Sequence, residues 1–427
     1  MPADRIFLSH RQTAAIAGAG LAAALVFAAD GRGDFPAEYT IEPLLPPGAP
    51  HSVSARGLYD DGTLGIEVSK GDSNSVGDVE AWVRFPDGTW LEADIPAGNN
   101  QINQLGAIGP DGTMYGTWRV DNNIFDQRAF KFTPDGTFTD IGRLPNAAGS
   151  PSNTFFNTAT AEYAACRTAN VGYVYRTSDS EIIELPTIQS TGLATAFGSN
   201  ADNRLVGISP SPDGSRATLW RKDGNDEFEA INMGLPADPI PDATSTARGV
   251  NNLDVAVGYT GTFTENDAFI WNEDDGMEVL PRIESQFSHF AYDISDEGVA
   301  VGYRAISTSN IGAVIWDSTT GDGYDLQPLV QNDEGWHLLD AQYINAGGQI
   351  MGRGILHGLH TVYLLTPVDE AIPGDLTGDG TVGGADLGIL LSEWGPCDDC
   401  DDCPADLTGN CNVGGADLGV LLSNWTN

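Results

Sequence analysis

The sequence has few positive charges. Its 427 residues include 20 Lys and Arg against 60 Asp and Glu, which gives a formal net charge of −40. Nucleic acids and anionic membrane surfaces are themselves negative, so this charge argues against both as partners. The acidic residues are spread along the chain rather than gathered in one tail, which is typical of a solvated protein surface.

Catalytic signatures are also missing. The sequence contains no Gly-x-Ser-x-Gly, no His-Glu-x-x-His, no phosphate-binding loop and no dinucleotide fingerprint. Histidine is rare, and His289 with His337 is the pair that could meet at one rim and serve a lyase or a metal site. No carboxylate pair suited to glycoside hydrolysis stands out among the 60 acids. We therefore assign no catalytic residue from the sequence.

Apolar runs of membrane-spanning length, about 20 residues, are absent from the sequence. The run from Ala14 to Ala28 is shorter and follows two positive residues, Arg5 and Arg11. A short apolar run behind positive charges, ending in small residues, is the pattern of a secretory signal peptide. We predict a signal peptide over residues 1–28 and a mature protein that is secreted, extracellular or held at the cell surface.

Cysteine is scarce, and four of the five cysteines lie in the C-terminal tail: Cys397, Cys400, Cys403 and Cys411. In an oxidising compartment these four predict two disulfides. A zinc site with four thiolates is the alternative, because C-x2-C-x2-C resembles a metal-ligand spacing. A Cys403–Cys411 bridge would brace the loop that follows Cys403. The fifth cysteine, Cys166, is expected to be a buried, small apolar residue.

One pattern recurs between residues 39 and 367. It pairs a short strand ending in an aromatic residue with a short strand ending in Gly, and the anchors lie roughly 41 to 51 residues apart. Asp-Gly dipeptides such as Asp61-Gly62 and Asp111-Gly112 separate apolar segments, as expected for hairpin turns. The aromatic strands are Ala81–Phe85, Ala129–Phe132, Gly172–Tyr175, Ala217–Trp220, Ala268–Trp271, Ala313–Trp316 and His360–Tyr363.

Four short strands per unit at this period are typical of β-propeller blades. Both strand series count to seven, so we predict an all-β fold with a seven-bladed β-propeller over residues 29–366. The last aromatic strand has no following partner, whereas Tyr39–Leu44 is a spare strand at the other end. We expect this N-terminal strand to complete the seventh blade and remove two exposed edges.

The tryptophans follow the same repeat. Trp220, Trp271 and Trp316 occupy equivalent positions, which favours packing between blades over stacking on sugars. Trp118 and Trp336 are less regular and are better candidates for a ligand surface. The segments Asn251–Gly258 with Ala268–Trp271, and Asn345–Gly352, resemble the HAF repeats of secreted bacterial proteins. This resemblance covers roughly residues 50–365 and implies no particular activity.

The tail contains one twelve-residue pattern twice, beginning at Asp375 and at Asp406. Oxygen-bearing side chains at loop positions 1, 3, 5 and 12 are those that surround Ca²⁺ in EF-hand-type loops. Each loop leads into a short apolar helix, Leu387–Trp394 or Leu418–Trp425. The predicted calcium ligands are Asp375, Thr377, Asp379, Thr381 and Asp386 in the first loop, and Asp406, Thr408, Asn410, Asn412 and Asp417 in the second.

These loops resemble a type I dockerin, and the resemblance covers about residues 373–427. It implies a small, secreted, α-helical domain of EF-hand type over residues 375–427, joined by a linker at 367–374 and docking onto a cohesin-like or other extracellular scaffold protein. The sequence departs from that family in having Thr at position 3, Gly-Ala at positions 10 and 11, and Cys411 where Gly is usual. The first loop has three carboxylates and the second two, so we expect weaker Ca²⁺ binding at the second.

Two functions fit these features. The first is a secreted, non-catalytic binding or adhesion protein, whose propeller binds a polysaccharide or protein and whose calcium-dependent tail tethers it to an extracellular complex or surface. The alternative is an enzyme of polysaccharide catabolism, a lyase or glycoside hydrolase, because dockerins are commonly appended to such enzymes.

Overall fold

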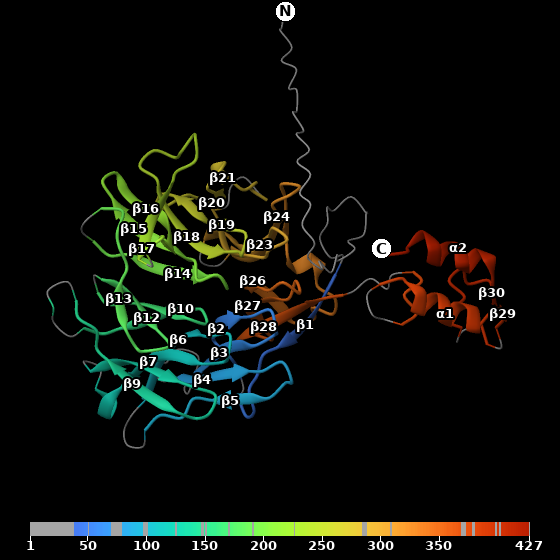
Figure 1. Cartoon of the computed structure of the whole chain (residues 1–427), viewed down its shortest axis with the longest axis horizontal. Helices are drawn as coiled ribbons and strands as arrows, with labels where there is room; N and C mark the ends of the chain where they lie inside the picture. Colours follow the sequence, from blue (N-terminus) through green and yellow to red (C-terminus); the bar gives the residue numbers. More distant parts are fainter. Residues whose placement is uncertain are drawn as a thin grey trace, which may run out of the picture.

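The computed structural model describes residues 38–426 except 50, 70–78, 97–100, 124–125, 147–148, 150–151, 170, 190–191, 226, 284–287, 308–309, 369–372, 378–380, 398 and 401–402. The signal peptide predicted at residues 1–28 lies outside this range. Within it, seven four-stranded antiparallel sheets are arranged around a common centre (Figure 1). The prediction of a seven-bladed β-propeller is confirmed.

Six blades follow the chain in simple order, from the innermost strand outward. They are β2 (Ser54–Leu58), β3 (Leu64–Ser69), β4 (Val79–Arg84), β5 (Trp90–Glu92); β6 (Gln101–Ile108), β7 (Met114–Arg119), β8 (Gln127–Phe132), β9 (Phe138–Gly142); β10 (Phe155–Ala159), β11 (Tyr163–Arg167), β12 (Gly172–Arg176), β13 (Ile182–Glu184); β14 (Thr195–Ser199), β15 (Leu205–Ser211), β16 (Gly214–Lys222), β17 (Phe228–Gly234); β18 (Thr244–Val250), β19 (Ala256–Gly261), β20 (Asn266–Asn272), β21 (Gly276–Val279); and β22 (Ser288–Ile294), β23 (Val299–Ser307), β24 (Asn310–Asp317), β25 (Asp322–Asp325). Short 3-10 helices lie at Val120–Asn122 and Gln327–Leu329.

The seventh blade joins the two ends of the propeller. It contains β26 (Trp336–Ile344), β27 (Ile350–Leu356), β28 (Leu359–Pro367) and, as its outermost strand, β1 (Tyr39–Pro43). β1 pairs antiparallel with β28, with Ile41 opposite Leu365. The predicted closure by the N-terminal strand is therefore confirmed, and it gives the edge of β28 a partner.

Repeated asparagines link neighbouring blades at the ends of the inner strands. The Asn200 amide donates to the Asn251 carbonyl at 2.7 Å, and the Asn251 amide donates to the Ser295 carbonyl at 2.9 Å. The Asn345 amide donates to the Tyr59 carbonyl at 3.1 Å, which ties the last blade to the first. The asparagine that begins the predicted repeat is thus a blade-to-blade connector.

Every inner strand contains a β-bulge where it pairs with the second strand of its blade. At the bulge, the backbone of the inner strand packs against a glycine of the second strand. This glycine is the last residue of the repeated second-strand motif. A Cβ atom on Gly207 would lie 1.9 Å from the Thr195 carbonyl oxygen, and one on Gly302 would lie 1.9 Å from that of Phe290. The repeated glycine is needed because no side chain fits there.

Large side chains fill the spaces between blades. Trp220, Trp271 and Trp316 are buried, as predicted. The indole N–H groups of Trp220 and Trp316 donate to the carbonyls of Pro186 and Pro281, at 2.7 and 3.0 Å. The expectation that Trp118 contributes to a ligand surface is wrong, because it is buried with its ring edge against Phe138. Trp336 is half-buried and packs edge-on against Tyr363.

The C-terminal segment has two helices of equal length, α1 (Gly384–Ser392) and α2 (Gly415–Ser423), and a two-stranded pair, β29 (Gly395–Pro396) with β30 (Asn412–Val413). Figure 1 shows these elements outside the ring of blades. Their shared core consists of Val382, Leu390, Ala405, Val413 and Leu421. Neither helix, nor any other within the described residues, is long and apolar enough to cross a membrane.

The tail cysteines form two disulfides, Cys397–Cys403 and Cys400–Cys411. The disulfide alternative therefore holds over the zinc site, and the pairing that the sequence left open does not include a Cys403–Cys411 bridge. Cys400 reaches Cys411 instead, because their Cα atoms lie 4.9 Å apart. Cys411 has a left-handed backbone with φ of 60°, the conformation that the family pattern assigns to Gly. Cys166 is buried and forms no disulfide, as expected.

Candidate functional site

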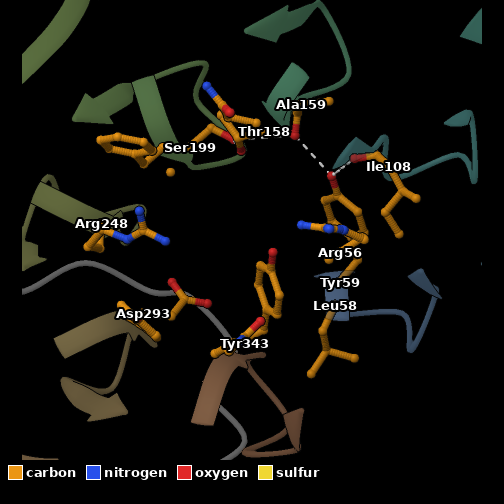
Figure 2. A pocket seen from close by; sticks show the side chains of 16 residues that line it. Arg56, Leu58, Tyr59, Ile108, Thr158, Ala159, Ser199, Arg248, Asp293 and Tyr343 are labelled. Carbon is orange, nitrogen blue, oxygen red and sulfur yellow. Dashed lines mark hydrogen bonds between the residues drawn. The ribbon is translucent and has the colours of Figure 1, made fainter. Parts of the chain in front are cut away.

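The inner-strand bulges surround a cavity at the centre of the propeller. A bulge leaves one residue outside the regular pairing and re-aims its side chain. We call the seven residues at these positions the bulge ring: Arg56, Gly106, Asn157, Phe197, Arg248, Tyr292 and Gln342. All seven line a cavity of about 350 Å³, a volume typical of small-ligand pockets. Figure 2 shows an adjoining pocket of about 90 Å³, which shares Arg56, Arg248 and Tyr343 with this cavity.

Small residues beside the bulges allow the inner strands to approach closely. A Cβ atom on Gly198 would lie 2.0 Å from the Arg248 carbonyl oxygen, and one on Gly249 would lie 2.6 Å from the Cα atom of Asp293. These contacts join β14 to β18 and β18 to β22. The side chains at the bulges are therefore held by a tightly packed backbone rather than by mobile loops.

Two of the arginines at this cavity have carboxylate partners. Arg56 Nε donates to Glu67 at 3.0 Å, and Glu67, which is almost fully buried, also accepts the Leu105 N–H at 2.7 Å. Arg353 Nε donates to the buried Asp340 at 2.9 Å. The positive charges of Arg56 and Arg353 are neutralised by carboxylates within the protein. These ion pairs therefore hold the inner strands in position.

Arg248 is placed differently. Its guanidinium carbon lies 4.6 Å from the centre of the Phe197 ring and 4.8 Å from the centre of the Tyr292 ring. Both rings belong to the bulge ring, in the blades on either side. No ion pair joins Arg248 to any other residue in the described part of the chain. The aromatic faces hold the cation without neutralising it.

Asp293 is a carboxylate that lines the pocket in Figure 2. It follows the bulge residue of β22 and accepts the backbone N–H groups of Ile294 at 3.0 Å and Ile344 at 3.1 Å. Burial raises the pKa of Asp293 to about 7, against the opposing effect of these two hydrogen bonds. Figure 2 shows its carboxylate facing the same opening as Arg248 and Arg56.

Tyrosine hydroxyls complete the lining. The Tyr59 hydroxyl donates to the carbonyl of Ile108 at 2.6 Å and lies 2.9 Å from that of Ala159, so it links three blades (Figure 2). Burial raises the pKa values of Tyr59, Tyr292 and Tyr343 above the ordinary range. These hydroxyls therefore stay neutral near pH 7 and act as hydrogen-bonding groups.

The two histidines considered from the sequence do not form a site together. They lie near the starts of neighbouring inner strands, β22 and β26, rather than in loops. His289 is buried against Trp316 and accepts the Ile283 N–H at 3.2 Å, while His337 is exposed. Packing between blades explains His289, so the possible rim pair is not formed.

The two tail loops repeat one arrangement of oxygen atoms. In the first loop, Thr377 Oγ1 lies 3.2 Å from Asp375 Oδ1 and 2.9 Å from Asp386 Oδ1. In the second, Thr408 Oγ1 lies 3.4 Å from Asp406 Oδ1 and 2.8 Å from Asp417 Oδ1. Positions 1, 3 and 12 thus converge in both loops. Thr381, Asn410 and Asn412 lie in the same loops, and Asp379 lies outside the described residues.

The position-12 carboxylates are buried at the starts of the helices. Asp386 is 1 % exposed and Asp417 is fully buried. Burial opposes their ionisation, but hydrogen bonds donated by Gly383 and Thr377 to Asp386, and by Gly414 and Thr408 to Asp417, outweigh it and keep both pKa values below the ordinary range. Each carboxylate is therefore ionised near pH 7.

These oxygen sets fit calcium chemically. Carboxylate, hydroxyl and amide oxygens are the ligands that Ca²⁺ prefers. Asp386 already accepts four hydrogen bonds, from Leu376, Gly383 and both the N–H and the hydroxyl of Thr377, so a bound cation would replace some of them. The loops also have internal partners, since Asp406 accepts the N–H groups of Asn410 and Cys411 at 3.0 and 2.6 Å.

The bulge ring was not found from the sequence, although a signal for it exists. The tripeptides Ala55-Arg56-Gly57 and Ala247-Arg248-Gly249 lie at the same position of two repeats, and Ala291-Tyr292-Asp293 is at the equivalent position of a third. An alignment of the repeats on their inner strands, instead of on their aromatic strands, would have shown that the bulge position differs from unit to unit.

No protein-family model matches the chain, and no curated protein matches it. Solved structures do. The chain is similar to virginiamycin B lyase from Staphylococcus aureus, with 14% identity and a TM-score of 0.50, over 78% of this chain and 100% of that one. It is also similar to the β-propeller domain of the Trilobed protease from Pyrococcus furiosus, with 10% identity and a TM-score of 0.43, over 79% and 96% of the two chains. A puromycin hydrolase aligns at 13% identity and a TM-score of 0.49, over 75% of this chain and 52% of the hydrolase. At these identities the similarity shows the fold alone.

Proposed function

We propose that the protein is a secreted, non-catalytic binding protein, in which the propeller binds a polysaccharide or protein and a calcium-dependent, dockerin-like tail tethers it to an extracellular scaffold or surface. The observation that carries this proposal is the bulge ring. One residue from each blade, with a side chain in all but Gly106, faces one opening through the same backbone device, which is an arrangement suited to ligand binding.

The duplicated loops support the tether. Asp375, Thr377, Thr381 and Asp386 would hold Ca²⁺ in the first loop, together with Asp379. Asp406, Thr408, Asn410, Asn412 and Asp417 would hold it in the second. Bound calcium would serve a structural purpose, because it draws the ends of each loop together at the start of a helix.

Exposed apolar side chains on the two helices and just beyond their C-terminal ends support a docking surface. Leu391 and Trp394 are 53% and 50% exposed, and the equivalent Leu422 and Trp425 are 52% and 37% exposed. Exposed leucine and tryptophan pairs are costly in water unless a partner covers them. A cohesin-like protein or another extracellular scaffold is the partner that the dockerin resemblance implies.

The tether is tested by sedimenting full-length protein with the cell surface fraction of its source, with calcium and with chelator. We expect association in calcium and its loss in chelator or in the double variant Asp375→Ala with Asp406→Ala. Arg221→Gln changes an arginine that is ion-paired with Glu229 and Glu273 on the outside of the propeller and is the matched control. Association that persists in chelator would contradict the tether.

An enzyme of polysaccharide catabolism is the second candidate, supported by one observation. A carboxyl whose pKa is near neutrality is suited to general acid or base catalysis, and Asp293 lines the cavity with its pKa raised to about 7. Product formation from a glycan panel that is abolished by Asp293→Asn would favour this function. Absence of product alongside measurable glycan binding would favour the binding protein.

A further inference from the structure

We propose that the central cavity binds a short saccharide bearing a carboxylate, and that Arg248 is the residue that recognises the carboxylate. This inference rests on the proposed function, namely that the propeller binds a ligand at this cavity, and it specifies the chemical class of that ligand. The argument begins with the position of the Arg248 side chain.

Arg248 projects from its bulge on β18 toward the opening (Figure 2). An aromatic ring packs on its guanidinium from each neighbouring blade. Phe197 and Tyr292 belong to the adjacent blades, so the guanidinium is held between neighbouring inner strands. Stacking on rings restricts the guanidinium while leaving its N–H donors unused. The side chain is therefore organised in advance for an acceptor that comes from outside the protein.

The other two arginines at the cavity provide an internal comparison. Arg56 donates to Glu67 and Arg353 donates to Asp340, and both carboxylates are buried. Arg248 has no such partner within the described residues, although the chain contains three times as many acidic as basic residues. A planar guanidinium forms two parallel hydrogen bonds with a carboxylate, the commonest partner of arginine in proteins.

The rest of the lining favours a saccharide over a simple anion. The bulge ring contributes the amide side chains of Asn157 and Gln342, and Tyr343 adds a hydroxyl group. The hydroxyls of Thr158 and Ser199 line the adjoining pocket and are hydrogen-bonded to each other at 2.7 Å. Neutral hydroxyl and amide groups match the many hydroxyls of a sugar. A cavity of about 350 Å³ also has room for more than an inorganic ion.

The overall charge limits the length of the ligand. A formal net charge of −40 repels a long polyanion before it reaches the cavity. One uncompensated arginine suits one carboxylate, so the ligand is a short acidic saccharide or the end of a chain rather than the middle of a densely charged polymer.

The test uses full-length protein and a panel of uronic acid disaccharides, each paired with its carboxyl-reduced neutral counterpart, in isothermal titration calorimetry at fixed salt. We expect at least one uronate to bind about 10- to 100-fold more tightly than its reduced counterpart, the range for a hydrogen bond to a charged group. Arg248→Gln should remove that preference. Arg248→Lys, which keeps the charge but loses the planar fork, should retain part of it.

Arg221→Gln is the control, because it removes one positive charge from a site outside the cavity and should leave binding unchanged. A melting temperature measured for each variant separates loss of binding from loss of fold, and Phe197→Leu tests the stacking without altering Arg248. Acetate, phosphate and sulfate are titrated as competitors.

Several results would overturn the inference: no uronate binds, reduced and acidic sugars bind equally, Arg248→Gln keeps the preference, or acetate competes as strongly as the uronate. Equal binding of acidic and neutral sugars would leave the proposed binding function intact and refute the role of Arg248. Failure of every saccharide and protein ligand to bind would refute the proposed function as well.

Discussion

The propeller buries tryptophan and tyrosine side chains between its blades, whereas the C-terminal tail buries five small aliphatic side chains and leaves Trp394 half exposed. The tail compensates with covalent and polar contacts. Two disulfides cross the segment between its helices, and two buried carboxylates, Asp386 and Asp417, gather backbone N–H groups at the helix starts.

This difference shows two ways of stabilising a repeated sequence. A closed ring of blades gives each apolar face a neighbour, so hydrophobic burial is sufficient. Two copies of a loop and a short helix bury too little surface for that, as expected for a domain of about fifty residues. Such a domain needs crosslinks or a metal.

If the tail binds calcium as proposed, removal of calcium should have the largest effect and should act on the tail alone. We expect chelator to unfold residues 375–427 completely while the propeller stays folded, because metal binding free energy is folding free energy in small metal-dependent domains. Limited proteolysis followed by mass spectrometry locates the cleavage. Tail resistance that is unchanged in chelator would contradict the calcium sites.

A matched pair of tryptophan variants compares the two cores directly. Trp316→Ala should destabilise the propeller by about 3 to 5 kcal/mol, because it leaves a cavity and removes the bond to the Pro281 carbonyl. Trp394→Ala should change stability by less than about 0.5 kcal/mol, since its side chain is half exposed. Urea unfolding followed by circular dichroism measures both. Equal losses would mean that the tail tryptophan is structurally buried.

The two proposed calcium loops can be compared with each other. Asp375→Ala should weaken calcium binding more than Asp406→Ala, by about tenfold or 1.4 kcal/mol, because the first loop has three carboxylates and the second has two. Calorimetric titration of full-length variants measures both affinities. Equal losses would show that carboxylate number does not set the difference.

The smallest effect concerns pH and the propeller. Since burial raises the folded-state pKa of Asp293 to about 7, the unfolded state binds fewer protons between about pH 4 and 7. The free energy of unfolding should therefore fall by about 1 kcal/mol as the pH rises through this range, and it should become level above it. The expected change is small because the group is partly hydrated. Asp293→Asn should flatten the profile in urea unfolding, and Asp274→Asn, in an exposed turn, should not.

The blade architecture could be predicted because its signals are local. Asp-Gly turns, short apolar strands and a fixed spacing each depend on a few adjacent residues. The pairing of β1 with β28 followed from counting strands, since one unit lacked a last strand and the N-terminus had one to spare. Trp118 was misassigned because its position in the repeat is irregular, while its burial depends on Phe138 in the same blade.

The candidate cavity was harder to predict. Its lining combines one residue from each of seven strands. The side chains among them are directed by β-bulges and not by the alternating pattern of a regular strand. An alternating pattern places residues on one face or the other, and it contains no signal for an extra residue in one strand. The cysteine pairing was open for a related reason, since β29 and β30 decide which sulfur atoms meet.

The amino-acid pattern alone specified seven β units, the strand that closes them and a duplicated loop and helix, because each depends on residues adjacent in the chain. Tertiary structure decided the rest: that Arg56 and Arg353 are paired while Arg248 is not, that His289 is buried, and that Cys400 bonds Cys411. Those outcomes depend on which distant groups become neighbours and how much water remains around them, and both are set when the ring closes and the tail folds.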